Sequence, residues 1–524
     1  MKPIYRQCFV TATACFNVVG LGCVVGFPAI LLPQLRKGNS LFNISRDTES
    51  WIAATFPLAS LLGNLLTPLV MERFGRKPAS LTMALLMMIG WFLIMLAPNV
   101  EVLLLGRVVQ GISCGFLNLL RSILVGEYTS PENRGAFLMV VSLSQSFGVF
   151  FVHLMGSLFS WQRTALVSVF FAFASFVLAI YMPESPSWLL AKDRIEEFRR
   201  VFLWLRGPKG NDELESMIKA KLALEAAEIQ DNHGKGIKKA LWIVRQTEFY
   251  KPIFIVISFN VMMHMAGGTT MANYSMSVLT GLMGAGANAH FWMVFLDSQR
   301  IVSNAIAVYI IKRVKRRVMV FGTTLLCIVS QVAIAIYSFW ISSTGVYSDI
   351  WIPVVLVNLQ MLSVAMGMVP MPNVITGEVF PLAYRGIAGM ISVQSGSLFM
   401  FAILKTFPLL LDTIGIHGTY GLYSLLLSAN MLYLWFALPE TKGKTLQEIE
   451  DEFRGNKFNS EEVEASKSIQ VENKDNQNTK QKIQKSNETI HNSNEIHQNA
   501  NDKIQNSNKK IQDSNETIQN TNQT

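Results

Sequence analysis

Long apolar runs, each separated from the next by a short charged or Pro/Gly-containing segment, recur from residue 8 to residue 438. A helix that crosses a membrane needs about 20 mostly apolar residues, and we find twelve runs of sufficient length. We therefore predict twelve membrane-spanning helices. Their approximate positions are residues 8–33, 51–71, 78–97, 102–124, 136–158, 164–182, 252–280, 289–311, 318–341, 350–372, 387–411 and 419–438.

Two polar segments interrupt or follow these runs. Residues 184–251 mix acidic and basic side chains in helical patterns and predict short amphipathic helices. Residues 455–524 consist largely of Asn, Gln, Lys, Ser and Glu and are too polar to bury a core, which predicts a disordered tail. A helical oligomerisation element is the alternative, although one isoleucine per heptad falls short of the two apolar positions that a coiled coil needs.

These segments divide the chain into four predicted regions. We expect an N-terminal six-helix bundle at residues 1–183, a cytosolic helical linker at 184–251, a C-terminal six-helix bundle at 252–454, and an Asn/Gln-rich cytosolic tail at 455–524.

Composition and charge agree with a membrane protein. Of all residues, 50% are hydrophobic and 15% are charged, against about 25% charged in an average soluble protein. With the N-terminus inside, the N-terminal segment and the short inner loops together carry twelve Lys and Arg residues, and the outer loops carry four. Basic residues stay on the cytosolic side, so we expect both termini in the cytosol of a multi-pass plasma-membrane protein. Asn43 opens an Asn-Ile-Ser sequon in the longest outer loop and is a candidate glycosylation site.

Several function classes are excluded. The sequence shows no nucleophile–base–acid set and no nucleotide-binding loop, so we do not expect an enzyme. No metal-ligand spacing occurs, and we expect neither a metal nor a cofactor. The basic residues near the spans orient the chain in the membrane, so the net positive charge does not indicate nucleic acid as a partner. The expected partners are a small-molecule solute and membrane lipids, with the protein as a monomer.

An internal repeat carries the functional argument. The segment "GEYTSPENRG" follows the fourth span and "GEVFPLAYRG" follows the tenth, with Glu127 and Arg134 offset by 251 residues from Glu378 and Arg385. The fold class is therefore an all-α membrane protein of two pseudo-symmetric six-helix bundles. In transporters, two repeated halves of this kind enclose a binding site near the membrane midplane. Transport occurs when one half rocks against the other.

Charged residues at the inner helix ends are candidates for gating. Such groups would pair when the cytosolic side closes and separate when it opens; the alternative is that they orient the chain and bind lipid headgroups. The candidate gating residues are Glu72, Arg73, Arg76, Arg107, Glu127, Arg134, Glu184, Arg313, Glu378, Arg385 and Glu440.

Six motifs, "ERFGRK", "GRVVQG", "EYTSPENRG", "PESPSWLL", "GEVFPLAYRG" and "PETKGKTLQEIE", occur in order along the chain. In order and spacing they resemble the motif series of the sugar-porter branch of the major facilitator superfamily, over about residues 8–453, and look most like those of insect facilitated trehalose and glucose transporters. The resemblance implies the major facilitator fold and passive or proton-coupled movement of a sugar.

The first span indicates whether transport is coupled to protons. Proton-coupled members place a carboxylate there, whereas "FNVVGLGCVVGF" has no acid, which favours a facilitator. Asp297 and Arg300, one helical turn apart inside the eighth span, are the exception. They form either a self-neutralised structural bridge or part of the transport path.

The family's sugar-binding residues are largely replaced. Met263 and His264 occupy the positions of two glutamines in the seventh span, and Asn373 replaces a stacking tryptophan in the tenth. Other polar side chains offer a different site, although each is equally a candidate for a helix–helix hydrogen bond. The candidate substrate-binding residues are His264, Thr269, Thr270, Asn273, Asn373 and Gln145.

The leading hypothesis is facilitative transport of a hexose or trehalose by alternating access. The alternatives are a non-transporting sugar sensor or scaffold whose tail recruits partners, and a porter of another small organic solute.

Overall fold

The computed structural model describes residues 3–36, 44–207, 210–230, 247–284, 286–347, 349–380, 385–444, 448–449 and 452–453. The side chains of Asn373 and Arg385 are not among those it describes. The predicted sequon at Asn43 and the predicted disordered tail at 455–524 also lie outside the described residues.

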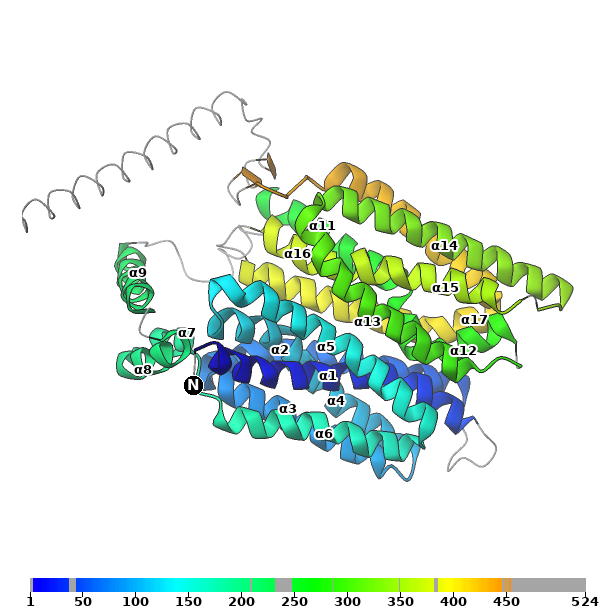
Figure 1. Cartoon of the computed structure of the whole chain (residues 1–524), viewed down its shortest axis with the longest axis horizontal. Coiled ribbons are helices and arrows are strands. Elements are labelled where there is room, and N and C mark those ends of the chain that lie inside the picture. Colours follow the sequence, from blue (N-terminus) through cyan, green and yellow to red (C-terminus); the bar gives the residue numbers. More distant parts are fainter. Residues whose placement is uncertain are drawn as a thin grey trace, which may run out of the picture. The chain divides into compact units, whose positions relative to one another are not determined.

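Six long helices form the first bundle (Figure 1). Helix α1 packs against α5 and α6, and α4 packs against both α2 and α3. Each of the six is long and apolar enough to cross a membrane. Their bounds are α1 Pro3–Leu35, α2 Arg46–Phe74, α3 Arg76–Met95, α4 Val100–Tyr128, α5 Pro131–Leu158 and α6 Trp161–Tyr181.

Three shorter helices follow: α7 (Pro186–Ala191), α8 (Ile195–Arg206) and α9 (Asn211–Gln230). They bury a small apolar cluster of their own, centred on Phe198 and Phe202. Because α7–α9 lie at one end of the bundles in Figure 1, we name that end the linker end and the opposite one the far end.

The second bundle follows α9 in the chain. A break at Gly267, whose φ is +91°, separates α11 from α12, and a π-helical turn, η2, joins α15 to α16. The bounds are α11 Thr247–Met265, α12 Gly268–Met283, α13 Ala289–Arg313, α14 Arg316–Thr344, α15 Trp351–Ser363, η2 Val364–Met368, α16 Pro370–Val379 and α17 Arg385–Ala437.

Helix α17 contains two crossings. Its 53 residues include Gly415, which has a non-helical φ of +69°. The side chain of Asn260 on α11 bonds to Ser392, and Asn430 bonds to Ser258, two residues away from Asn260. Residues on either side of Gly415 therefore lie at the same level of α11, so the chain reverses there.

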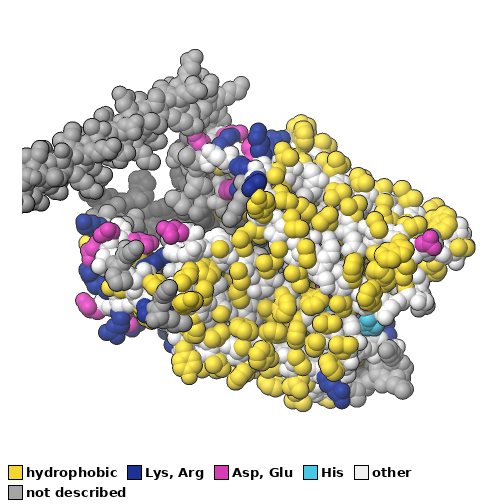
Figure 2. Space-filling view, viewed as in Figure 1, with side chains coloured by type: hydrophobic (Ala, Val, Ile, Leu, Met, Phe, Trp, Pro, Cys, Tyr) yellow, Lys and Arg dark blue, Asp and Glu magenta, His cyan; other side chains and the backbone are white. Residues whose placement is uncertain are grey.

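The helices confirm the predicted architecture. Eleven helical segments of the described chain are long and apolar enough to span a membrane, and the reversal inside α17 adds a twelfth crossing. Figure 2 shows one face on which hydrophobic side chains cover the spanning part, while Lys, Arg, Asp and Glu gather toward the linker end. This is the surface expected of helices in contact with lipid.

Close packing of α1 on α5 depends on glycines. A Cβ at Gly22 would lie 2.8 Å from the Cα of Gly148 and would overlap the backbone oxygen of Gln145, whereas nothing lies within 4 Å of a Cβ at Gly20. We expect Gly22→Ala to lower the free energy of unfolding by about 1–3 kcal/mol, because backbone atoms cannot move aside. Gly20→Ala is the matched control and should change it by less than about 0.5 kcal/mol. Thermal unfolding in detergent measures both, and equal melting temperatures would refute the packing argument.

Candidate functional site

A charged cluster joins helix ends of the first bundle at the linker end. The guanidinium of Arg76, at the start of α3, pairs with the carboxylate of Glu127 near the end of α4, at 2.8 Å. Glu184 accepts the backbone N–H of Arg76 at 2.7 Å and that of Lys77 at 3.2 Å. The Ser185 hydroxyl donates to Glu127. A carboxylate thus caps the positive end of the α3 dipole.

The second bundle repeats this cluster residue for residue. Arg316, at the start of α14, pairs with Glu378 of α16 at 2.9 Å, and the Thr441 hydroxyl donates to Glu378. Glu440 accepts the backbone N–H groups of Arg316 at 3.0 Å and Arg317 at 3.2 Å. Burial alone would raise the pKa of Glu440, but these donors and the N–H of Lys442 hold that pKa below its ordinary value.

Each charged cluster lies within one bundle and does not link the two bundles. The clusters bring together five of the candidate gating residues: Arg76, Glu127 and Glu184 in the first bundle, and Glu378 and Glu440 in the second. Arg134, seven residues after Glu127, is not the ionic partner of Glu127. It donates instead to the backbone oxygen of Gly126 at 2.6 Å. Each cluster therefore fixes the helix ends of its own bundle.

The other gating candidates lie apart from these pairs. The Glu72 backbone oxygen accepts from Trp188, Arg73 lies over the ring of Phe74, and Arg313 lies over that of Tyr309.

Arg107 is fully buried away from the linker end. Its guanidinium donates to the backbone oxygens of Ile52 at 3.0 Å and Val24 at 2.9 Å and lies over the ring of Phe56. These partners all belong to α1 and α2, so the structure gives Arg107 the contacts of a residue that holds three helices of the first bundle together.

Ion pairs between the bundles occur at the far end. Lys405 of α17 contacts Asp47 of α2 at 2.6 Å and the Ser50 hydroxyl at 2.8 Å. Arg46 lies 3.6 Å from Asp412. Among the described residues no ion pair joins the two bundles at the linker end. In this state the far end is closed.

A buried polar contact between the bundles reinforces that closure. His153 of α5 contacts Asp297 of α13 through Nδ1, at 2.5 Å. Its Nε2 faces the backbone oxygens of Gly26 at 3.1 Å and Ala272 at 3.3 Å. Arg300 lines the same small cavity, so the Asp297 carboxylate faces an imidazole and a guanidinium.

Neutral polar side chains line the seam between α2 and α17. The Asn64 amide donates to Gln394 and to the Ser397 hydroxyl of the second bundle, both at 3.1 Å. Asn118 of α4 donates to Asn64 at 3.3 Å. Ser60 donates to Ser397 at 3.0 Å. This is the hydrogen-bonding chemistry that a hydroxyl-rich solute requires.

Four of the predicted substrate-binding residues do not form part of these seam contacts. They lie around the break between α11 and α12 at Gly267. His264 and Thr269 contact each other at 3.0 Å, Thr270 donates to the oxygen of Gly267, and Asn273 donates to that of Thr269. All four are buried. Gln145 contacts Arg121, at 3.4 Å.

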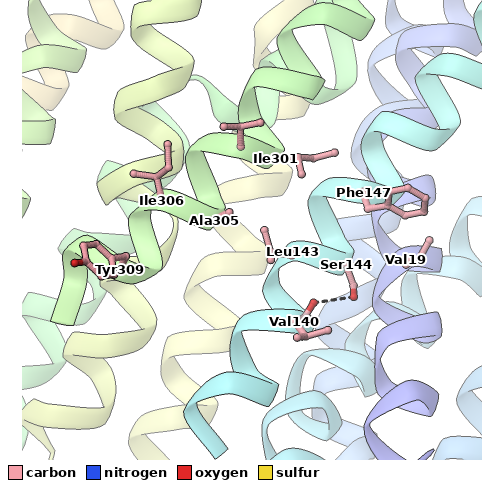
Figure 3. Close-up of a pocket in the computed structure, with 10 residues that line it drawn as sticks. Val19, Val140, Leu143, Ser144, Phe147, Ile301, Ala305, Ile306 and Tyr309 are labelled. Atoms are coloured by element: carbon pink, nitrogen blue, oxygen red, sulfur yellow. Dashed lines mark hydrogen bonds between the residues drawn. The ribbon is translucent and has the colours of Figure 1, made fainter. Parts of the chain in front are cut away.

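An apolar groove of about 790 Å³ lies between α5 and α13 (Figure 3). The Ser144 hydroxyl inside it already donates to the oxygen of Val140. Apart from the exposed Tyr309, the lining offers no free polar group to a sugar. We therefore do not assign the solute to this groove.

Sequence reasoning missed His153, Asn64, Asn118 and Arg121. Each lies among apolar residues in a spanning segment, and for His153 and Arg121 that position was the available signal, because ionisable side chains inside spanning segments are functional candidates by default.

Two pseudo-symmetric helical bundles with matched charge clusters and a cross-bundle closure at one end define a membrane transporter of the major facilitator fold, and not an enzyme. The family model described as "Sugar (and other) transporter" matches residues 6–453, and the chain belongs to this family.

Similar proteins agree with this assignment. The facilitated trehalose transporter Tret1 of Bombyx mori is 27% identical, over 80% of this chain and 81% of the relative. Tret1 of Apis mellifera ligustica is 26% identical, over 81% and 83%. The inward-open xylose transporter XylE from E. coli superposes with a TM-score of 0.67 at 17% identity, over 86% of this chain and 99% of XylE.

Glu378 offers a test of what the linker-end clusters do. We expect Glu378→Gln to lower the maximal transport rate about tenfold, which corresponds to about 1.4 kcal/mol in the barrier, and to change the half-saturating concentration less than about twofold. Without the Arg316 pair, α14 and α16 no longer move as one body. Glu452→Gln, which removes the more exposed pair with Lys444, is the control. Equal changes in both kinetic constants would show a purely structural role.

Proposed function

We propose that the protein is a facilitator that moves a sugar, a hexose or trehalose, across the plasma membrane by alternating access. The observation that carries the proposal is the asymmetry of the charged contacts. Ion pairs bridge the bundles at the far end, through Lys405 and Asp47, whereas the linker-end pairs lie within each bundle. Two bodies that are each internally braced can separate at either end in turn.

We further propose that the linker end faces the cytosol. Basic side chains at this end, including Arg73, Arg134 and Arg313, support that orientation. The far end would then be extracellular and closed. We propose that Gln145 of α5 and the amides of Asn64 and Asn118 at the seam between α2 and α17 contact the solute. The roles predicted for His264, Thr269, Thr270 and Asn273 stay predictions.

Passive transport is supported by the first helix. Helix α1 contains no Asp or Glu, and a proton-coupled cycle needs a titrating group in the path. The relatives named above carry the name of facilitated trehalose transporters.

Uptake of radiolabelled glucose and trehalose into oocytes tests the proposal. We expect saturable flux that does not accumulate solute above the external concentration and that a proton ionophore leaves unchanged. Surface-expressed protein without saturable flux of any sugar would refute sugar transport. Accumulation that the ionophore abolishes would refute the passive mechanism.

A further inference from the structure

Arg121 lies inside the spanning helix α4 and has no ionic partner among the described residues. It lies in the apolar stretch "NLLRSILV" of α4, seven residues before the end of that helix at Tyr128. Its Nη1 donates to the Gln145 side chain at 3.4 Å, and no described acidic side chain forms an ion pair with it. Ionisable residues in spanning segments are costly and mark solute pathways.

The side chain points toward the middle of the bundle. Gln145 lies fourteen residues after the start of α5 at Pro131, about 21 Å along that helix at 1.5 Å per residue. An arginine that merely reached for the membrane surface would point the other way, toward Glu127 at the linker end. Glu127 is already paired with Arg76.

Arg121 differs from two other arginines inside the spans. Arg107 donates to two backbone oxygens, and Arg300 lines a small cavity together with Asp297. Among the described residues Arg121 has only the long bond to a neutral amide, and its side chain is partly exposed within the bundle. Its remaining N–H donors are therefore open to an incoming ligand.

The neighbouring groups are neutral and suited to hydroxyls. Asn118, three residues earlier and so on the same face of α4, bonds to Asn64. Asn64 in turn reaches Gln394 and Ser397 of the second bundle. A guanidinium three residues along α4 from a chain of amides and hydroxyls that reaches the second bundle combines a site for an anion with a site for a polyol.

We propose that Arg121 binds the carboxylate of a sugar acid, and that the solute supplies the missing counter-charge. This inference rests on the proposed transport function and specifies its substrate class. The planar guanidinium fork matches a carboxylate in bidentate geometry. A carboxylate balances one arginine, whereas a phosphate monoester carries about −1.5 to −2 charges at pH 7 and would leave charge uncompensated in the membrane.

Proteoliposomes with purified protein test the proposal, using labelled glucuronate and glucose and unlabelled glucose 6-phosphate as a competitor. We expect saturable glucuronate uptake with a half-saturating concentration at least about tenfold below that of glucose, because a charge-assisted hydrogen bond is stronger than a neutral one. Glucose 6-phosphate should compete poorly. Arg121→Gln should raise the half-saturating concentration for glucuronate at least about tenfold and that for glucose less than twofold.

Three further measurements keep the test decisive. Arg163→Gln, which removes an exposed cation at the start of α6, is the matched control and should change neither solute. Arg121→Lys keeps the charge without the fork and should weaken glucuronate less than Arg121→Gln. Glucuronate should also raise the melting temperature of the wild-type protein more than glucose does.

The outcomes separate the two proposals. Saturable glucose uptake that glucuronate does not inhibit, or an equal effect of Arg121→Gln on both solutes, overturns the role of Arg121 and leaves sugar transport intact. Stronger competition by glucose 6-phosphate overturns the choice of a carboxylate. Folded protein that transports neither sugar overturns the proposed function and the inference with it.

Discussion

Asp297→Ala is expected to lower the sugar uptake rate at least about tenfold and the free energy of unfolding by about 3–5 kcal/mol. The Asp297 side chain is 9% exposed and faces the His153 imidazole on the other bundle at 2.5 Å. Arg300 lies in the same cavity. Loss of the carboxylate leaves buried positive charge without a counter-ion, which is the most damaging way to disrupt a buried ion pair.

An exposed ion pair at the same end provides a control for the effect of Asp297→Ala. Asp412, 44% exposed at its side chain, lies 3.6 Å from Arg46 at the same end of the bundles. Because exposed pairs contribute about 0–1 kcal/mol, Asp412→Ala should change the melting temperature and the uptake rate little. Asp297→Asn keeps a hydrogen-bond acceptor for His153 but removes the charge. Its melting temperature and uptake rate should lie between those of Asp297→Ala and Asp412→Ala. Equal effects of Asp297→Ala and Asp412→Ala would contradict a buried closure of the far end.

The architecture was predictable because its signals are local in sequence. The length of each apolar run identified the crossings, including the two that form α17, where the sequence placed a gap between residues 411 and 419 and the structure places the reversal at Gly415. The repeat of Glu127 and Glu378 identified the two halves.

Partners of the polar residues were harder to predict, because helix packing chooses them. Asp297 was considered with Arg300, one turn along the same helix, whereas its hydrogen-bond partner is His153 on the other bundle. Glu127 and Arg134 stand seven apart in sequence, yet Glu127 pairs with Arg76, 51 residues away. Spacing along one helix gives no information about which side chain a neighbouring helix presents.

The second large effect concerns the far end itself. Lys405 and Asp47 come from different bundles and touch at 2.6 Å, and Lys405 also lies over the Trp51 ring. If the bundles rock, this contact must break in every cycle so that the far end can open. A covalent bond in its place would hold the protein in the state described here. The expected loss of transport is nearly complete, because no solute can enter or leave through the far end.

The most direct measurement uses cysteines at positions 47 and 405 in a background without the five native cysteines. A short bis-methanethiosulfonate reagent joins them through a disulfide at each thiol. Radiolabelled sugar uptake should fall to the background of empty vesicles after cross-linking and return when the link is reduced. Each single-cysteine variant treated with the same reagent should keep its uptake and serves as the control. If the cross-link forms in most molecules and uptake continues at its original rate, the bundles do not move apart at the far end, and transport by alternating access is contradicted.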